Sequence, residues 1–269
     1  MKISPQQVKE LRDRTAAGIL ACKKALQQAG GSIEKAIDIL RAEGVAKAAR
    51  RESREAREGV IRLRISDNGR DAALLELNCE TDFVARTEDF LKLADELVDL
   101  LLQDGEEALQ EEEVQSRISE LAATLGEKIS LRRAVRWQKD GWIGSYLHHN
   151  GRVAALVEIT ENLPQIAGEL AMQAAATNPP YLSESGVPAE EKKREWEIFR
   201  QQIQDKPEAI QDKIITGKWH KRLTELCLVN SPFLRDDKIS VTQYLGKQSS
   251  PSGKPLEIID FIRWELGES

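Results

Sequence analysis

The residues of this chain whose types could do chemistry gather at one junction, Asn78-Cys79-Glu80-Thr81-Asp82-Phe83-Val84. It holds two acids, Glu80 and Asp82, and an aromatic side chain beside the second acid. Paired carboxylates can act as general acid and base, but two acids without a pocket signature are a weak case for catalysis. A polar junction with an aromatic also suits contact with another molecule, because loops on a rigid scaffold tend to carry function.

Histidine and cysteine are sparse, with three of each in the chain. His148 and His149 adjoin a turn and have no acid or cysteine at metal-ligand spacing, and a metal site needs several convergent ligands. Cys22, Cys79 and Cys227 form no CxxC pair, which argues against a disulfide framework and against zinc. Phosphate-loop, GxSxG and HExxH motifs are also missing. We therefore expect no enzyme active site, no metal and no cofactor.

The composition is that of an ordinary globular protein with two or three domains in 269 residues. The formal net charge of −6 disfavours a general nucleic-acid binder, because phosphate recognition needs a basic face. No run of 18 or more apolar residues is present, so we expect no membrane span. The N-terminus has no apolar signal region, and we expect a cytoplasmic protein.

The junction must be positioned by a strand that ends at Cys79 and a helix that begins soon after it. The same plan occurs twice, because the sequence NGRDAALLEL at 68–77 returns as NGRVAALVEI at 150–159. Each copy lies between one strand and a following helix. A repeat this long predicts a duplicated α+β core with small antiparallel sheets and helices on one face of each. The two core subdomains are expected at 59–140 and at 141–182 with 229–269.

The two copies differ after the returning strand, because Asp82-Phe83 is present only in the first copy. One interpretation is an ordinary helix start, with Thr81 or Asp82 as its cap and Phe83 packed inward. A purely architectural need would be expected in both copies, however. The difference therefore favours a role for these residues outside the fold.

Residues 1–45 are predicted to form a small domain of three short helices. Ser4-Pro5-Gln6-Gln7 is a helix start with a capping box, and Gly30-Gly31 ends the second helix before Ser32 starts the third. A unit of this size is marginal alone. It is therefore expected to sit on a partner or on the rest of the chain.

The second helix of this domain has Leu20 outside its apolar stripe, next to two lysines. A single exposed leucine needs no explanation. The alternative is a contact patch built from Ile19, Leu20 and Lys23, with Arg12 nearby.

Residues 46–58 are predicted to form a basic linker helix that carries Arg50, Arg51, Arg54 and Arg57 at helical spacing, interleaved with glutamates. A solvated helix is the favoured interpretation. An RNA- or ribosome-binding adaptor is the alternative, although no aromatics interleave with the arginines.

Residues 183–228 interrupt the second copy and are predicted to form an antiparallel helical hairpin. Trp196, Phe199 and Ile203 are the apolar line of its first helix. Its seam could close on itself, which is the commoner case, or pair with a second copy of the chain or with another partner. A homodimer is therefore a possible assembly, and a structural dimerisation protein is a third functional hypothesis.

Two long motifs resemble one family. The run LRDRTAAGILACKKAL at 11–26 and the run NCETDFV at 78–84 are similar to the two signatures of translation elongation factor Ts. The spacing, the repeat and the hairpin also match, so the resemblance covers nearly the whole chain. It implies a guanine-nucleotide exchange factor for elongation factor Tu and a ubiquitin-associated-like fold for the N-terminal helices.

The resemblance also implies roles for particular positions. The segment Thr81, Asp82, Phe83 and Val84 would press on the nucleotide domain of elongation factor Tu beside its bound magnesium. Phe83 would enter an apolar pocket, so that the phosphate site is disturbed and GDP leaves. The second half of the core would contact the third domain of Tu. The positions that would dock the chain on Tu are Arg12, Ile19, Leu20, Lys23 and His148.

Overall fold

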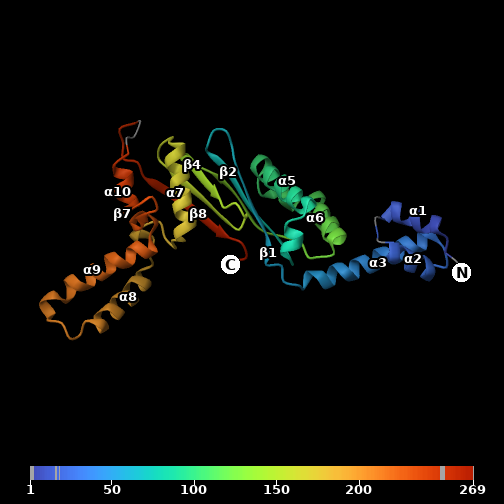
Figure 1. Ribbon diagram of the computed structural model, residues 1–269, viewed down its shortest axis with the longest axis horizontal. Coiled ribbons are helices and arrows are strands. Elements are labelled where there is room, and N and C mark those ends of the chain that lie inside the picture. Colours follow the sequence, from blue (N-terminus) through green and yellow to red (C-terminus); the bar gives the residue numbers. More distant parts are fainter. Residues whose placement is uncertain (1–2, 16, 18, 249–251, 269) are drawn as a thin grey trace.

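The computed structural model of the chain describes residues 3–15, 17, 19–248 and 252–268, with the side chains of 43–52 outside the description. Within these residues, two three-stranded antiparallel sheets pack face to face at the centre (Figure 1). Helices cover their outer faces. An N-terminal helical module lies at one end of the elongated molecule and a helical hairpin at the other (Figure 1). The predicted α+β class with a duplicated core and an inserted hairpin is confirmed.

The first sheet has the strand order β1-β2-β3, and helices α5 and α6 pack on it across a large apolar core. Its elements, with a one-turn helix α4 and a short 3-10 helix between α5 and α6, are β1 (Glu58–Ile65), β2 (Asp71–Cys79), α4 (Asp82–Ala85), α5 (Glu88–Asp104), the 3-10 turn (Glu107–Gln110), α6 (Glu112–Leu125) and β3 (Ser130–Gln138).

The second sheet repeats this plan with the order β4-β5-β8 and with α7 on its outer face. Its main elements are β4 (Trp142–Leu147), β5 (Val153–Ile159), α7 (Pro164–Thr177) and β8 (Ile258–Glu265). Smaller elements precede β8, namely 3-10 turns at Glu184–Gly186 and Leu228–Asn230, β6 (Pro232–Phe233), β7 (Asp236–Ser240) and α10 (Val241–Gly246).

The duplication extends to individual hydrogen bonds between the two sheets. Ile143 of β4 donates its backbone N–H to the carbonyl of Gly69 (2.8 Å), and Ile61 of β1 donates to the carbonyl of Gly151 (2.7 Å). Both glycines have a φ of +67°, a value that disfavours side chains with a Cβ. Each hairpin turn is therefore held by the first strand of the other copy.

The strand β2 is apolar on both of its faces. Ala73 and Leu75 face the core under the helices, whereas Ala72 and Leu74 face the core between the two sheets. The sequence pattern predicts the helical cover but not the contact of one sheet with the other. Because both faces of each sheet are covered, the two copies form one continuous packed unit.

A buried carboxylate on the central strand of the first sheet ties the two sheets together. Glu76 of β2 has no exposed surface. It accepts from Arg133 Nε (2.7 Å) and from the backbone N–H of Gly267 (2.9 Å), and Gly267 follows β8 of the other sheet. Glu158 has the equivalent place in β5 and is also buried.

The N-terminal module consists of α1 (Pro5–Thr15), α2 (Ile19–Gln28) and the first part of α3 (Ile33–Glu52). The predicted capping box is formed, since Gln7 N–H donates to Ser4 Oγ (3.2 Å) and Ser4 N–H donates to Gln7 Oε1 (3.0 Å). Its core contains the fully buried side chains of Leu11, Cys22 and Leu26.

The separate linker helix predicted at 46–58 is not observed as such. Helix α3 runs from Ile33 to Glu52 as one element, and the residues that follow it up to β1 are not helical. The chain has to leave the helix here because β1 begins at Glu58, and Arg54 in this connection is held by an ion pair with Glu80 (3.1 Å).

The inserted hairpin consists of α8 (Ala189–Gln202) and α9 (Glu208–Leu226). Its seam closes on itself through an apolar cluster in which Phe199 of α8 and Ile203, which caps the end of α8, meet Trp219 and Leu223 of α9. The hairpin thus has its own small core.

Candidate functional site

The segment Thr81–Val84 lies between β2 and α5, and its side chains point to opposite sides. Thr81 is the N-cap of α4, and its Oγ1 accepts from the N–H of Val84 (3.4 Å). Val84 and Ala85 are buried in the core under the helices. Phe83 is 81% exposed. The interpretation with Phe83 packed inward is therefore wrong, because the single turn of α4 directs Val84, not Phe83, into the core.

Asp82 is also accessible, with a side chain that is 44% exposed. Its carboxylate pairs with Arg86 one helical turn later (2.9 Å). Exposed pairs of this kind contribute little to stability, at most about 1 kcal/mol. The carboxylate can therefore exchange Arg86 for a group on another molecule at small cost.

The start of the segment is held by the carboxylate of Glu127, a residue that the sequence patterns do not single out. Glu127, just after α6, accepts from the backbone N–H groups of Glu80 (3.1 Å) and Thr81 (3.0 Å) and from the Thr81 hydroxyl (2.6 Å). The Cys79 thiol donates to the Thr81 carbonyl (3.1 Å). Burial, followed by the charge of Glu127, raises the pKa of Cys79 to about 12. The thiol is therefore neutral and serves as a hydrogen-bond donor.

The second copy of the core has no counterpart of α4. There β5 ends at Ile159, and α7 begins at Pro164 after a short connection. The shared scaffold folds without this turn of helix. The fold of the core therefore does not require α4 or the exposed Phe83 that it carries.

The predicted patch on the N-terminal module is exposed. Leu20 is 82% exposed and Ile19 57% exposed, and Arg12 and Lys23 are exposed as well. Ile19 thus belongs to the patch and not to the buried stripe of α2, because it is the first residue of that helix and no described element covers it. Neither Arg12 nor Lys23 has a charged partner within the part of the chain that the structure describes.

His148 follows β4 at the turn of the second hairpin and is half-buried. Its Nδ1 lies 3.1 Å from Asn150 Oδ1, and its ring centroid lies 4.2 Å from that of His149. The residues 81–84 are brought together by one turn of helix.

Among the described contacts, none joins that segment to His148 or to the patch on α2, so these are three separate surfaces on three elements.

Two of the four arginines predicted on the basic linker lie in the connection after α3, and each is paired with a glutamate. Arg54 pairs with Glu80, and Arg57 pairs with Glu55 (3.1 Å). Arg50 and Arg51 lie outside the described side chains. The structure therefore adds no support to the RNA-binding alternative.

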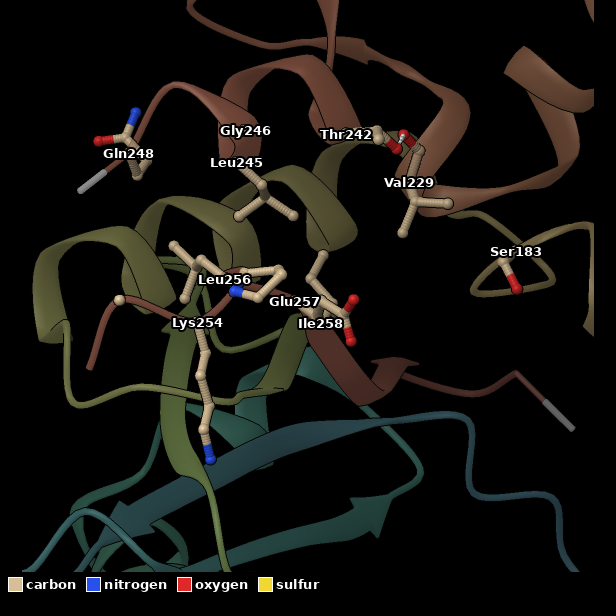
Figure 2. A pocket seen from close by; sticks show the side chains of 12 residues that line it. Ser183, Val229, Thr242, Leu245, Gly246, Gln248, Lys254, Leu256, Glu257 and Ile258 are labelled. Atoms are coloured by element: carbon tan, nitrogen blue, oxygen red, sulfur yellow. Dashed lines mark hydrogen bonds between the residues drawn. The ribbon is translucent and has the colours of Figure 1, made fainter. Parts of the chain in front are cut away.

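A cavity of about 790 Å³ lies between α10 and the loop that leads into β8 (Figure 2). Its lining includes the apolar side chains of Leu245 and Leu256, together with Thr242, whose hydroxyl donates to the Val229 carbonyl (2.8 Å). None of the residues that sequence analysis selects lines this cavity. Its described lining contains no histidine or cysteine that could form a nucleophile–base pair.

The residues that the structure describes bear on two further possibilities, a metal site and a membrane span. No group of three or more histidine, cysteine, aspartate or glutamate side chains among them is arranged to hold a metal ion. Among the helices so described, none combines the length and the apolar character needed to cross a bilayer.

Phe83 and Leu20 are both large apolar side chains that are exposed on an element whose other face is packed. A family model described as Elongation factor TS matches residues 80–268. The chain belongs to the elongation factor Ts family.

Relatives with the name Elongation factor Ts match over the full length. That of Prosthecochloris aestuarii is 41% identical over 285 residues, covering 99% of both chains. That of Nitratidesulfovibrio vulgaris is 41% identical, covering 100% of this chain and 97% of its own. That of Lawsonia intracellularis is 38% identical, covering 100% of both.

Proposed function

We propose that this chain is a guanine-nucleotide exchange factor that binds elongation factor Tu with GDP and promotes the release of GDP, so that GTP can bind. Membership of the elongation factor Ts family implies exchange on elongation factor Tu in translation elongation. The observation that carries the proposal for this chain is the 81% exposure of Phe83 on a turn of helix absent from the second copy.

In the proposed mechanism, Phe83 enters an apolar pocket of the Tu nucleotide domain, and Asp82 reorganises residues beside the magnesium and phosphate site of Tu. Complete burial of one phenylalanine contributes about 1.5–3 kcal/mol. That is less than the binding free energy of a tightly held nucleotide with its metal. Phe83 alone therefore cannot expel GDP, and further docking contacts have to supply the difference.

The remaining surfaces provide such contacts. The α2 patch of Ile19 and Leu20, flanked by Arg12 and Lys23, is proposed to dock on a helix of the Tu nucleotide domain. His148 and the second half of the core are proposed to contact Tu elsewhere, including its third domain. Because these surfaces are on separate elements, they can bind at once and hold the 81–84 segment against its target.

Binding coupling is reciprocal, so a factor that weakens nucleotide binding is itself released by nucleotide. The chain would therefore bind Tu most tightly without nucleotide, leave when GTP binds, and act repeatedly with no bond made or broken. A cytoplasmic location follows from this role.

The test is the release of labelled GDP from elongation factor Tu with catalytic amounts of the chain. We expect wild type to accelerate release. Phe83→Ala should lower the second-order rate constant about 10- to 100-fold, the equivalent of the lost burial, and Asp82→Ala should also slow release. The free energy of unfolding of Phe83→Ala should change by less than about 0.5 kcal/mol, because the side chain is exposed in the free protein.

The matched control is Ile210→Ala, which removes another exposed apolar side chain, 44% exposed on the hairpin. It should exchange like wild type. If wild type fails to accelerate release, the proposed function is wrong. If Phe83→Ala and Asp82→Ala both exchange at the wild-type rate, the proposed site is wrong.

A further inference from the structure

The 81–84 segment is fastened to the loop after α6 by a reciprocal pair of glutamates. Glu127 accepts from the N–H of Glu80, while Glu80 accepts from the N–H of Lys128 (2.7 Å). The two loops thus exchange side chain-to-backbone hydrogen bonds in both directions, although about 47 residues separate them in the chain. Glu80 is further held by Arg54 (3.1 Å).

Glu127 is the member of the pair that reaches the segment itself. One carboxylate oxygen accepts from two adjacent backbone N–H groups, those of Glu80 and Thr81, and the other accepts from the Thr81 hydroxyl. Both oxygens are therefore occupied by the two residues that precede Asp82. Thr81 in turn caps α4, so Glu127 acts on the helix that carries Phe83 through its cap.

The turn that places Glu127 is itself defined by the backbone. Gly126 ends α6 in the left-handed region with a φ of +78°, which is the usual glycine C-cap. No heavy atom lies within 4 Å of the position of a Cβ at Gly126. The glycine is therefore required by its conformation and not by crowding, and this conformation turns the chain so that the next residue reaches Thr81.

The four residues of α4 cannot hold their own conformation, because helices shorter than about 12 residues are marginal in water. Burial of Val84 and Ala85 fixes the inner side of the turn. A negative charge near a helix N-terminus also stabilises the helix. The outer side, with Phe83, has no packing of its own in the free protein, so its direction depends on how firmly the cap is held.

We infer that Glu127 is a positioning residue for exchange, which fixes the Thr81 cap and so holds Phe83 in the orientation needed for entry into the partner. This inference rests on the proposed function. A pre-oriented contact avoids the ordering cost that a mobile one has to meet on binding. Glu127 does not itself have to contact elongation factor Tu.

The test separates docking from the action of Phe83 by measuring GDP release over a range of factor concentrations. Glu127→Ala leaves two backbone N–H groups and one hydroxyl without their acceptor. We expect the release rate at saturating factor to fall about 3- to 10-fold. The factor concentration at half-saturation should change less than 2-fold, because the other docking surfaces are intact.

Two conservative variants test the geometry. Glu127→Gln keeps an oxygen for the two N–H groups, and its amide N–H can donate to the Thr81 hydroxyl, so it should restore most of the saturating rate. Glu127→Asp keeps the charge but is one methylene shorter, and it should remain impaired. If Glu127→Ala does not unfold cooperatively, it is not properly folded and its rate cannot be interpreted. The rates of Glu127→Gln and Glu127→Asp then test the positioning role. Equal rates for them would overturn the inference.

Non-additivity tests the route through Phe83. If Glu127 acts by orienting Phe83, Glu127→Ala should add little to the defect of Phe83→Ala, because residues that act as a unit do not add. Full multiplication of the two defects would show that Glu127 acts independently and would overturn the inference. Glu120→Ala is the matched control, since Glu120 on α6 is exposed and its carboxylate accepts from the Ser116 hydroxyl (3.2 Å) on the same helix.

The outcomes distinguish the inference from the proposal beneath it. If wild type fails to accelerate GDP release, both the proposed function and the positioning role of Glu127 are wrong. A wild-type effect that Phe83→Ala abolishes but Glu127→Ala leaves unchanged preserves the proposed function and rejects the positioning role. A larger effect of Glu127→Ala on the half-saturating concentration than on the saturating rate also rejects it, and assigns Glu127 to docking.

Discussion

The buried Glu76 provides a quantitative test of how the two sheets are joined. Glu76→Ala removes a fully buried carboxylate that bonds Arg133 Nε (2.7 Å) and the Gly267 N–H (2.9 Å). Breaking a buried ion pair by removing one partner typically costs 3–5 kcal/mol. Arg133 keeps the Glu265 carbonyl (2.8 Å) and its contact with the Trp264 ring (4.4 Å), so we expect the lower value, about 3 kcal/mol.

The duplicated core contains its own comparison. Glu158 accepts from the Gly141 N–H (3.0 Å) and lies 3.6 Å from Lys139 Nζ. Lys139 also pairs with Asp260 (2.9 Å) and would keep that partner in Glu158→Ala. The main loss is then one backbone hydrogen bond to a charged group, about 1.5–3 kcal/mol at most. We expect about 1.5 kcal/mol, half the cost of Glu76→Ala.

Urea unfolding followed by far-ultraviolet circular dichroism measures both values, provided that the slope m is the same for each variant. Glu113→Ala, an exposed glutamate on α6, is the control and should change the free energy of unfolding by less than about 0.5 kcal/mol. A cost for Glu158→Ala equal to or above that of Glu76→Ala would refute the reasoning. It would mean that Asp260, the partner that Lys139 keeps, does not reduce the cost.

Two further predictions concern a thiol and the hairpin. Burial and the charge of Glu127 raise the pKa of Cys79 from 9.0 to about 12, so its stabilising contribution is complete below about pH 9 and is lost as the pH rises through 12. The urea midpoint should therefore fall more steeply between pH 9 and 11 in wild type than in Cys79→Ala, and parallel curves would contradict this. Because the hairpin seam is closed by its own residues, replacing residues 189–226 by a short Gly-Ser loop should leave the number of chains per particle unchanged in light scattering. A change from dimer to monomer would instead support the dimerisation hypothesis.

The duplicated core could be predicted because ten adjacent residues recur almost unchanged, which no accident of composition would produce. The packing of one sheet on the other was not predicted, because the repeat predicts helices on one face of each sheet and leaves the other face undescribed. The apolar run of β2 from Ala72 to Leu75 is the available signal, since strands buried on both faces have continuous apolar runs.

The exposure of Phe83 could not be decided from local sequence, because a helix start and a contact site use the same residues. The structure decides it through Val84, which occupies the inward position. Glu127 was missed for a different reason. Its partners lie about 46 residues away in the chain, and a lone glutamate after a glycine carries no pattern that points to them.

Helix α3 has a consequence for how the docking surfaces act together. Its 20 residues span about 30 Å at 1.5 Å per residue, and it joins the module that carries Leu20 to the core that carries Phe83 (Figure 1). A continuous helix sets an azimuth as well as a length, because each residue adds about 100° of rotation. Helix α3 thus sets part of the distance and of the angle between the two contacts, and the non-helical residues that follow it up to β1 set the rest. A partner can bind the surfaces around Leu20 and Phe83 at the same time only if its own two sites match that distance and that angle.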